Sequence, residues 1–415
     1  MRSPLERFLE YVKVETTSSE ESSSTPSTPS QFELAKLLTK ELKELGLEDV
    51  EVDEHCYVTG FLPSNIKESK GRIPTIGLIS HLDTSCAASG SNIKAKVITY
   101  EGGDIALQNG AVIKETDEMK KLIGDRFVVT DGTTLLGADD KAGIAAIMTC
   151  LERLASSSVP RPNVRVCFTP DEEIGNGTAF FNLEKFKADC AYTVDGGPGG
   201  EINYETFTAD KAVLVVHGVD VHPGEAKGVM VNAARILGKI LAKLPSDRAP
   251  ETTEAREPFI HLYKCHGGVT SAQAEFLLRA FDEEAREKNK QILLKVVEDV
   301  FNEDRLLEKP QVSFEQQYLN MGYFLKDCPY VLSTLEEAVR RSGLVPRWIP
   351  IRGGTDGSRL TEMGLPTPNI FTGGRNFHSV MEFLDVEELE KSAEVLLHLM
   401  ELWGEKRFGS DGKLI

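Results

Sequence analysis

Histidine and acidic residues recur in this sequence at the points where short apolar stretches end. Residues 75–80 (TIGLIS) run directly into His81 and Asp83, whose side chains share one face of an extended strand. A carboxylate beside an imidazole can fix the ring and leave its other nitrogen free for a metal ion. Taken alone, the pair is better explained as a strand-end histidine with a capping aspartate.

Acidic residues follow three further apolar stretches. They are Asp139 and Asp140 after TTLLGA, Asp171, Glu172 and Glu173 after VCFTP, and Asp195 after CAYTV. A helix cap explains one such acid. Because the carboxyl ends of parallel strands form one crevice, we expect these side chains to converge there, where without cations they would raise one another's pKa.

A histidine after one more apolar stretch, NIFTGG, completes a candidate set of metal ligands. The set is His81, Asp139, Glu173, Asp195 and His378. Imidazole and carboxylate ligands without a thiolate suit zinc, manganese or cobalt. Its three carboxylates offset three of the four positive charges of two divalent ions and a bridging hydroxide offsets the fourth, so the tally favours a pair of metals.

This ligand set predicts hydrolysis of an amide or peptide bond. Two ions roughly 3.5 to 4 Å apart can share a water, lower its pKa and polarise a carbonyl oxygen. Glu172, next to the candidate ligand Glu173, can reach that water, take its proton as general base and deliver it to the departing amine. Asn376 lies beside His378 in the sequence and is expected to line the pocket.

The elements that must position these residues alternate between helix and strand. Apolar periodicity predicts helices at 32–45 and 141–154 and strands at 75–80, 163–168 and 190–194. This order indicates an α/β fold with a mixed, mostly parallel sheet and helices on both faces. Residues 16–30 are rich in Ser, Thr and Pro, and we expect a mobile surface loop that adds nothing to a core.

A different order begins near residue 211. The pattern predicts strand 211–219, helix 229–244, strand 260–265, strand 274–281, a helix from Ala285 to Val300 and strand 311–318. This is the ferredoxin-like α+β arrangement, and it accounts for about 110 residues, the size of a domain. We therefore expect an inserted domain at 209–320 within a catalytic domain formed by 1–208 and 321–415.

Composition excludes several other classes of protein. The 415 residues include 47 basic and 65 acidic side chains, so the net charge is 47 − 65 = −18, which disfavours nucleic acid as a partner. No apolar run reaches the roughly 18 residues that span a bilayer, and the N-terminus lacks a secretory pattern. Seven dispersed cysteines without a CxxC pair fit a reducing compartment. We expect a soluble cytoplasmic protein without a membrane partner.

Several long motifs occur together and in order: SHLDTS, TTLLGADDKAG, FTPDEEIGNG, YTVDGG, VHPGEAKGVMVNA, PIRGGTDGSRL, MGLPTPNIFTGG and NFH. At these residues, and over nearly the whole chain, the sequence resembles the M20 family of co-catalytic metallopeptidases, and within it the tripeptide aminopeptidases. The resemblance implies a zinc-peptidase-like catalytic domain, and an inserted domain that serves as a lid and in dimerisation.

The resemblance also assigns roles to individual residues. It implies that Asp139 bridges the metals, with a cis peptide bond to Asp140, while the other ligands divide as His81 with Asp195 and Glu173 with His378. Glu172 would be the general base, Asp83 the residue that orients His81, and His222 an oxyanion donor contributed across a dimer interface. Arg279 and Arg352 would hold the terminal carboxylate of the substrate.

The function implied is removal of the N-terminal residue of tripeptides by a homodimer with two divalent ions per chain, zinc foremost and manganese or cobalt as alternatives. Another amide hydrolase of the same fold, such as a dipeptidase or deacylase, is the alternative enzyme. The alternative without catalysis is a scaffold that binds peptides. The presence of Glu172 together with every candidate metal ligand speaks against it. Departures from the family pattern at Ala255 to Phe259, Ala280 and Ser379 bear on substrate preference.

Overall fold

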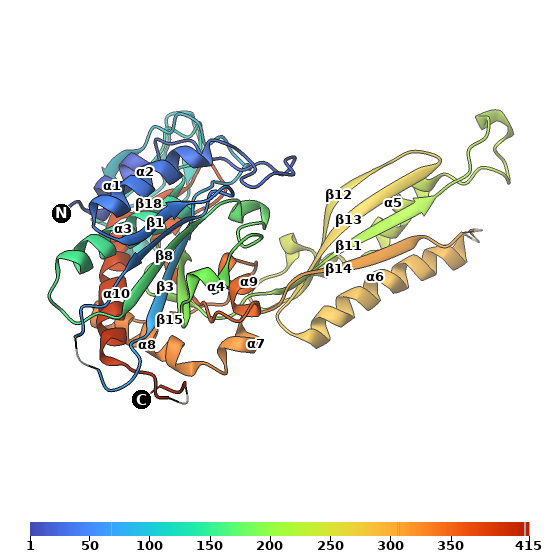
Figure 1. The fold of residues 1–415 in the computed structure, drawn as a ribbon. Coiled ribbons are helices and arrows are strands. Elements are labelled where there is room, and N and C mark those ends of the chain that lie inside the picture. The colour runs from blue at the N-terminus through green and yellow to red at the C-terminus, as the bar shows by residue number, and fades with distance from the viewer. Residues whose placement is uncertain (68, 305, 307, 411, 415) are drawn as a thin grey trace. The chain divides into compact units, whose positions relative to one another are not determined.

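The computed structural model describes residues 1–67, 69–304, 306, 308–410 and 412–414 (Figure 1). The chain divides into two compact units. The first unit comprises Met1–Tyr204, Phe324–Ile349 and Thr355–Ile415, and the second comprises Glu205–Tyr323 and Pro350–Gly354.

The first unit is built on an eight-stranded sheet with the order β1-β2-β8-β3-β9-β16-β10-β15. Its strands are β1 (Glu48–Val52), β2 (Val58–Leu62), β3 (Thr75–His81), β8 (Asn163–Thr169), β9 (Cys190–Gly196), β10 (Glu201–Asn203), β15 (Arg347–Trp348) and β16 (Asn369–Phe371). β8, β3, β9 and β16 run parallel, whereas β2 joins β8 and β10 joins β16 antiparallel. The predicted mixed, mostly parallel sheet is confirmed.

Helices pack against both faces of this sheet, because alternate residues of its central strands point to opposite sides. Ile76 and Leu78 of β3 join one apolar cluster with helices α1, α2, α3, α8 and α10, and Ile79 joins another with α4 and α9. The bounds are α1 (Pro4–Tyr11), α2 (Gln31–Glu44), α3 (Ala138–Ser156), α4 (Leu183–Phe186), α8 (Pro329–Arg341), α9 (Asp356–Glu362) and α10 (Val386–Glu405). Within the described residues, no helix combines the length and hydropathy needed to cross a bilayer.

A smaller sheet of the first unit was not predicted from the sequence. It has the order β17-β18-β7-β4, formed by β4 (Lys96–Thr99), β7 (Arg126–Val129), β17 (Gly374–Arg375) and β18 (Phe383–Asp385), and a hairpin of β5 (Ile105–Ala106) and β6 (Val112–Ile113) accompanies it. Phe127 packs between Tyr100 and Phe383, with ring centroids 4.8 and 5.0 Å apart. Strands of two to four residues carry too short an alternation to be recognised in the sequence.

The second unit has the predicted ferredoxin-like order. It contains β11 (Thr208–His217), α5 (Ala233–Lys243), β12 (Phe259–Gly267), β13 (Ser271–Ala280), α6 (Glu283–Glu303) and β14 (Gln311–Tyr318), and the short helix α7 (Gly322–Leu325) follows. The strands form one antiparallel sheet, β12-β13-β11-β14. Alternate residues of β13, among them Phe276 and Leu278, are buried in a separate core with α5 and α6.

The prediction that residues 16–30 add nothing to a core was wrong. Thr16, Ser18 and Ser27 are buried. The backbone N–H and hydroxyl of Ser27 donate to the carboxylate of Asp171 at 2.7 and 2.6 Å, and Gln31 Nε2 donates to it at 2.6 Å. Small hydroxyl side chains are readily buried once their hydrogen bonds are made, which composition alone does not reveal.

Candidate active site

The parallel strands β3, β8 and β9 deliver acidic and imidazole side chains to one edge of the large sheet. His81 is the last residue of β3, Asp195 lies near the end of β9, and Glu172 and Glu173 follow β8 in a short 3-10 turn, Glu172–Ile174. Asp139 lies at the start of α3, and His378 lies between β17 and β18. The five candidate ligands come from separate elements and meet in the first unit.

Asp139 lies between the two candidate histidines. Its Oδ1 is 2.9 Å from Nε2 of His81, and its Oδ2 is 3.2 Å from Nε2 of His378. The peptide bond between Asp139 and Asp140 is cis, as the resemblance implied. Because each carboxylate oxygen faces a different imidazole, this geometry suits a carboxylate that is shared by two ions.

The remaining candidate ligands divide between the two histidines. Asp195 Oδ1 is 3.7 Å from His81 Nε2, and Glu173 Oε2 is 2.8 Å from His378 Nε2. Ligand atoms of His81, Glu172 and Asp195 lie within 4.8 Å of one another, and so do those of His81, Asp139 and Glu173. His378 is half-exposed, so the cluster is open to solvent on that side.

The electrostatics of the cluster fit bound cations. Burial and the charge of Asp139 raise the pKa of Glu173 to about 8 and that of Asp195 to about 6. Glu173 Oε1 is buried and has no hydrogen-bond partner. Contacts with Asp139 and Glu173 raise the pKa of His378 to about 11. Divalent ions would compensate the carboxylates and satisfy the unpaired oxygen.

Asp83 is fully buried. Its carboxylate contacts both His81 and the turn that follows β8. Its Oδ1 is 3.3 Å from His81 Nδ1, and its two carboxylate oxygens accept the N–H groups of Glu172 and Glu173 at 3.0 and 3.2 Å. One carboxylate therefore contacts both a candidate ligand and the backbone that carries the candidate base. Burial raises the pKa of Glu172 itself well above its usual value.

Three further buried carboxylates support the cluster, and sequence reasoning did not single them out for this. Glu382 accepts the N–H groups of Leu136, Gly137 and Asp139 at 2.7, 2.8 and 3.0 Å. Asp356 accepts the Thr169 hydroxyl at 2.6 Å, and Asp140 accepts the hydroxyl of Ser80 and the N–H of His81. Asp140 and Asp356 lie in recognised motifs, whereas no local pattern marks Glu382.

The other sequence-predicted site residues make different contacts. His222, Arg279 and Arg352 belong to the second unit. Arg279 donates to the carbonyl of Asp210 at 3.2 Å, and Arg352 donates to that of Ala255 at 2.8 Å. His222 is exposed, and its Nδ1 accepts the N–H of Gly224 at 3.2 Å. In the first unit, Asn376 donates to the carbonyl of Met381 at 3.2 Å.

Comparison with known proteins identifies the family. The sequence pattern of peptidase family M20/M25/M40 matches residues 129–402. Peptidase T of Caldanaerobacter subterraneus subsp. tengcongensis is 45% identical over 412 residues, which cover 98% of this chain and 100% of that protein. The chain belongs to this family. It is a peptidase, and therefore a hydrolase.

Solved structures share the fold of this M20 peptidase. Aminopeptidase PepT from Bacillus cereus superposes with a TM-score of 0.74 at 24% identity, covering 97% of this chain and 98% of that one. A tripeptidase from Staphylococcus aureus superposes with a TM-score of 0.76 at 24% identity and the same coverage. Both matches extend over the two units described above.

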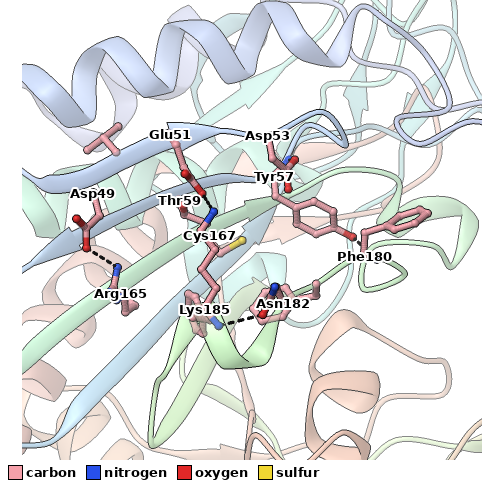
Figure 2. Close-up of a pocket in the computed structure, with 13 residues that line it drawn as sticks. Asp49, Glu51, Asp53, Tyr57, Thr59, Arg165, Cys167, Phe180, Asn182 and Lys185 are labelled. Carbon is pink, nitrogen blue, oxygen red and sulfur yellow. Dashed lines mark hydrogen bonds and ion pairs between the residues drawn. The ribbon is translucent and has the colours of Figure 1, made fainter.

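A separate cavity of the M20 peptidase is lined by residues of β1, β2 and β8 and of the segment 180–186 (Figure 2). It has a volume of about 550 Å³, and its wall combines the ion pair of Arg165 with Asp49 and the rings of Tyr57 and Phe180. None of the candidate metal ligands lines it. Tyr57 donates to the carbonyl of Gly177 at 2.9 Å, so the cavity wall contacts the loop that follows Glu173.

Proposed function

We propose that this M20 peptidase is a tripeptide aminopeptidase that uses two divalent ions per chain, zinc foremost and manganese or cobalt as alternatives. The observation that carries the proposal is the position of Asp139, whose two oxygens face different imidazoles at 2.9 and 3.2 Å. His81 and Asp195 would hold one ion with Asp139, and Glu173 and His378 would hold the other. When bound, such a pair lowers the pKa of a water and polarises the peptide carbonyl.

Glu172 takes the proton of the attacking water and delivers it to the departing amine. Two observations support this role. Glu172 follows β8 immediately beside Glu173, and a carboxylate oxygen of Glu172 lies within 4.8 Å of ligand atoms of His81 and Asp195. Burial raises the pKa of Glu172, so its carboxyl group can carry a proton between the two steps. Asp83 orients both His81 and the backbone of Glu172.

Four further residues are assigned to binding of the tripeptide. Arg279 and Arg352 hold its terminal carboxylate, which a guanidinium can bind through two hydrogen bonds. His222 of a partner subunit donates to the oxyanion, and Asn376 lines the pocket beside His378. The inserted domain, 209–320, serves as lid and dimerisation domain. The free state of all seven cysteines supports a reducing cytoplasm as the location.

Product analysis with matched peptides tests the proposal. The metal-loaded protein should convert a free tripeptide into an amino acid and a dipeptide, and should leave the N-acetylated tripeptide and the free dipeptide intact. Glu172→Gln should lower kcat by at least about 10²-fold because the proton carrier is lost, while two metal ions per chain remain bound. Faster cleavage of the acetylated peptide would indicate a deacylase-like hydrolase, and tight binding without turnover would indicate a scaffold.

A further inference from the structure

A second carboxylate cluster lies in the first unit, outside the proposed active site. It consists of Asp125 before β7, Asp385 at the end of β18 and Glu387 in the first turn of α10. One carboxylate oxygen from each residue lies within 4.8 Å of the others. The smaller sheet thus brings together three acids that are up to 262 residues apart in the sequence.

Asp385 has an oxygen that the protein itself leaves unsatisfied. The side chain is fully buried, with a relative exposure of 0%. Its Oδ1 accepts the N–H of Glu388 at 3.1 Å and caps α10, but Oδ2 is buried without a hydrogen-bond partner. An ionised oxygen in that position is costly unless a cation or a donor reaches it.

The neighbouring arginines neutralise only part of this cluster. Arg126 pairs with Glu387 at 2.8 Å, and Arg375 pairs with Glu388 at 2.9 Å. Across the part of the chain that the structure describes, no ion pair involves Asp125 or Asp385. Two negative charges therefore remain, and one divalent ion would balance them.

The surroundings of the two aspartates disfavour an uncompensated charge. Burial and the charge of Glu388 raise the pKa of Asp385 to about 7. Burial and the charge of Glu387 also raise the pKa of Asp125.

We propose that Asp125, Asp385 and Glu387 bind one Ca²⁺ ion that is distinct from the catalytic metals. The site offers only oxygen ligands, which suit hard cations, and it has no imidazole or thiolate that would favour zinc. Asp125 and Glu387 are half-buried, so water can fill the remaining positions that Ca²⁺ requires. Ca²⁺ accepts irregular oxygen sets, whereas Mg²⁺ requires near-octahedral geometry.

A bound ion would join β7, β18 and α10, and β18 directly follows the His378 loop. Asp385 ends β18, which pairs with both β17 and β7, and Glu387 lies in the first turn of α10. His378 lies in the connection between β17 and β18. Calcium would therefore raise the thermal stability of the first unit without taking part in the chemistry.

Thermal unfolding of the zinc-loaded protein with and without added Ca²⁺ tests the proposal. Ca²⁺ should raise the Tm of the wild type by several degrees, and Mg²⁺ should raise it less. Asp125→Asn should abolish the Ca²⁺ shift and should itself raise the Tm in calcium-free buffer, because it removes one of the two uncompensated charges. Isothermal titration should find one Ca²⁺ per chain in the wild type and none in the variant.

Two control variants separate this site from its surroundings. Glu390→Gln removes a nearby acid that contacts Arg126 at 3.3 Å but lies outside the cluster, and it should keep the full Ca²⁺ shift. His378→Ala disturbs the proposed active site, and this variant should also keep the full Ca²⁺ shift. The proposal is overturned if the wild type shows no Ca²⁺ shift, as expected if Asp125 and Asp385 simply share a proton. Persistence of the shift in Asp125→Asn, its loss in either control, or an equal shift with Mg²⁺ would also overturn it.

Discussion

Adjacent acidic residues acquire different surroundings in this peptidase. Glu173 lies 2.8 Å from His378, whereas the backbone N–H of Glu172 is held by Asp83 at 3.0 Å. The two side chains have the same chemistry, so only their contacts can make one a ligand and the other a base. Asp83 positions both residues, because its carboxylate accepts the N–H groups of Glu172 and Glu173 and also contacts His81.

Replacing Asp83 should impair catalysis through the residues that it orients. Asp83→Asn cannot accept both backbone N–H groups, and it removes the charge behind His81. We expect kcat or metal affinity to fall by about 10- to 100-fold, the usual cost of losing a group that orients a metal ligand. Steady-state kinetics with metal analysis checks this, and Asp53→Asn, which also alters a part-buried turn contact but is not among the candidate ligands, should change neither quantity. An unchanged kcat at saturating metal would contradict the role of Asp83.

Glu201 gives a pH-dependent prediction away from the metal ligands. Burial raises its pKa from 4.5 to about 7, although Arg347 lies 3.3 Å away. The folded state binds the proton more tightly than the unfolded state, so the contribution of Glu201 to stability is full below about pH 4.5 and is lost as the pH rises to about 7. As the pH rises from about 4.5 to about 7, the Tm of wild type should therefore fall relative to the Tm of Glu201→Gln. A Tm difference between the two proteins that stays constant or changes in the opposite direction would contradict the raised pKa of Glu201.

At the scale of elements, the connections between strands are held by distant segments. Asp171 adopts a left-handed conformation, with φ of 53°, directly before Glu172. Its carboxylate accepts hydrogen bonds from Ser27 and Gln31, which lie at least 140 residues earlier in the chain. The Ser- and Thr-rich segment therefore supports the turn that carries the proposed base.

Removing the Ser27 hydroxyl should loosen that turn. Ser27→Ala deletes a buried hydrogen bond to a carboxylate, and we expect a loss of about 1.5 to 3 kcal/mol in unfolding free energy. We also expect kcat to fall several-fold with little change in KM, because the turn carries Glu172 rather than a substrate contact. Denaturant unfolding and kinetics measure the two effects, with the exposed Ser23→Ala as matched control. If Ser27→Ala lowered stability but left kcat unchanged, the segment would have only a structural role.

At the scale of the whole molecule, the proposal needs a second copy of the chain. The proposed mechanism assigns His222 to the site of a partner subunit and Glu172 to the site of its own subunit. Each homodimer of Glu172→Gln or of His222→Ala should be nearly inactive. A heterodimer of the two variants contains one site that has both residues.

Coexpression of the two variants should therefore restore part of the activity. The tripeptide assay on the purified mixture measures the recovery, and sedimentation of each variant confirms that both are dimers. Each variant expressed alone is the control. No recovery in a confirmed heterodimer would indicate that His222 acts in its own subunit, and an active His222→Ala homodimer would indicate that His222 has no role.

The sequence by itself determined the fold class, the ferredoxin-like order and the family. These follow from local periodicity and from motifs in which neighbouring residues suffice, such as the alternation of β13 and the run from Asp171 to Glu173. Peptidase membership also follows from sequence, since 45% identity extends over 98% of the chain.

Only the tertiary structure decided which buried groups support the candidate site. Glu382 reaches the N–H of Asp139 across 243 residues, and Ser27 reaches Asp171 across 144. Their partners are chosen by how strands and helices pack, and no spacing along the chain encodes that choice. For the same reason the carboxylates of Asp125 and Asp385 meet only in the folded sheet, where the proposed cation would compensate their charges.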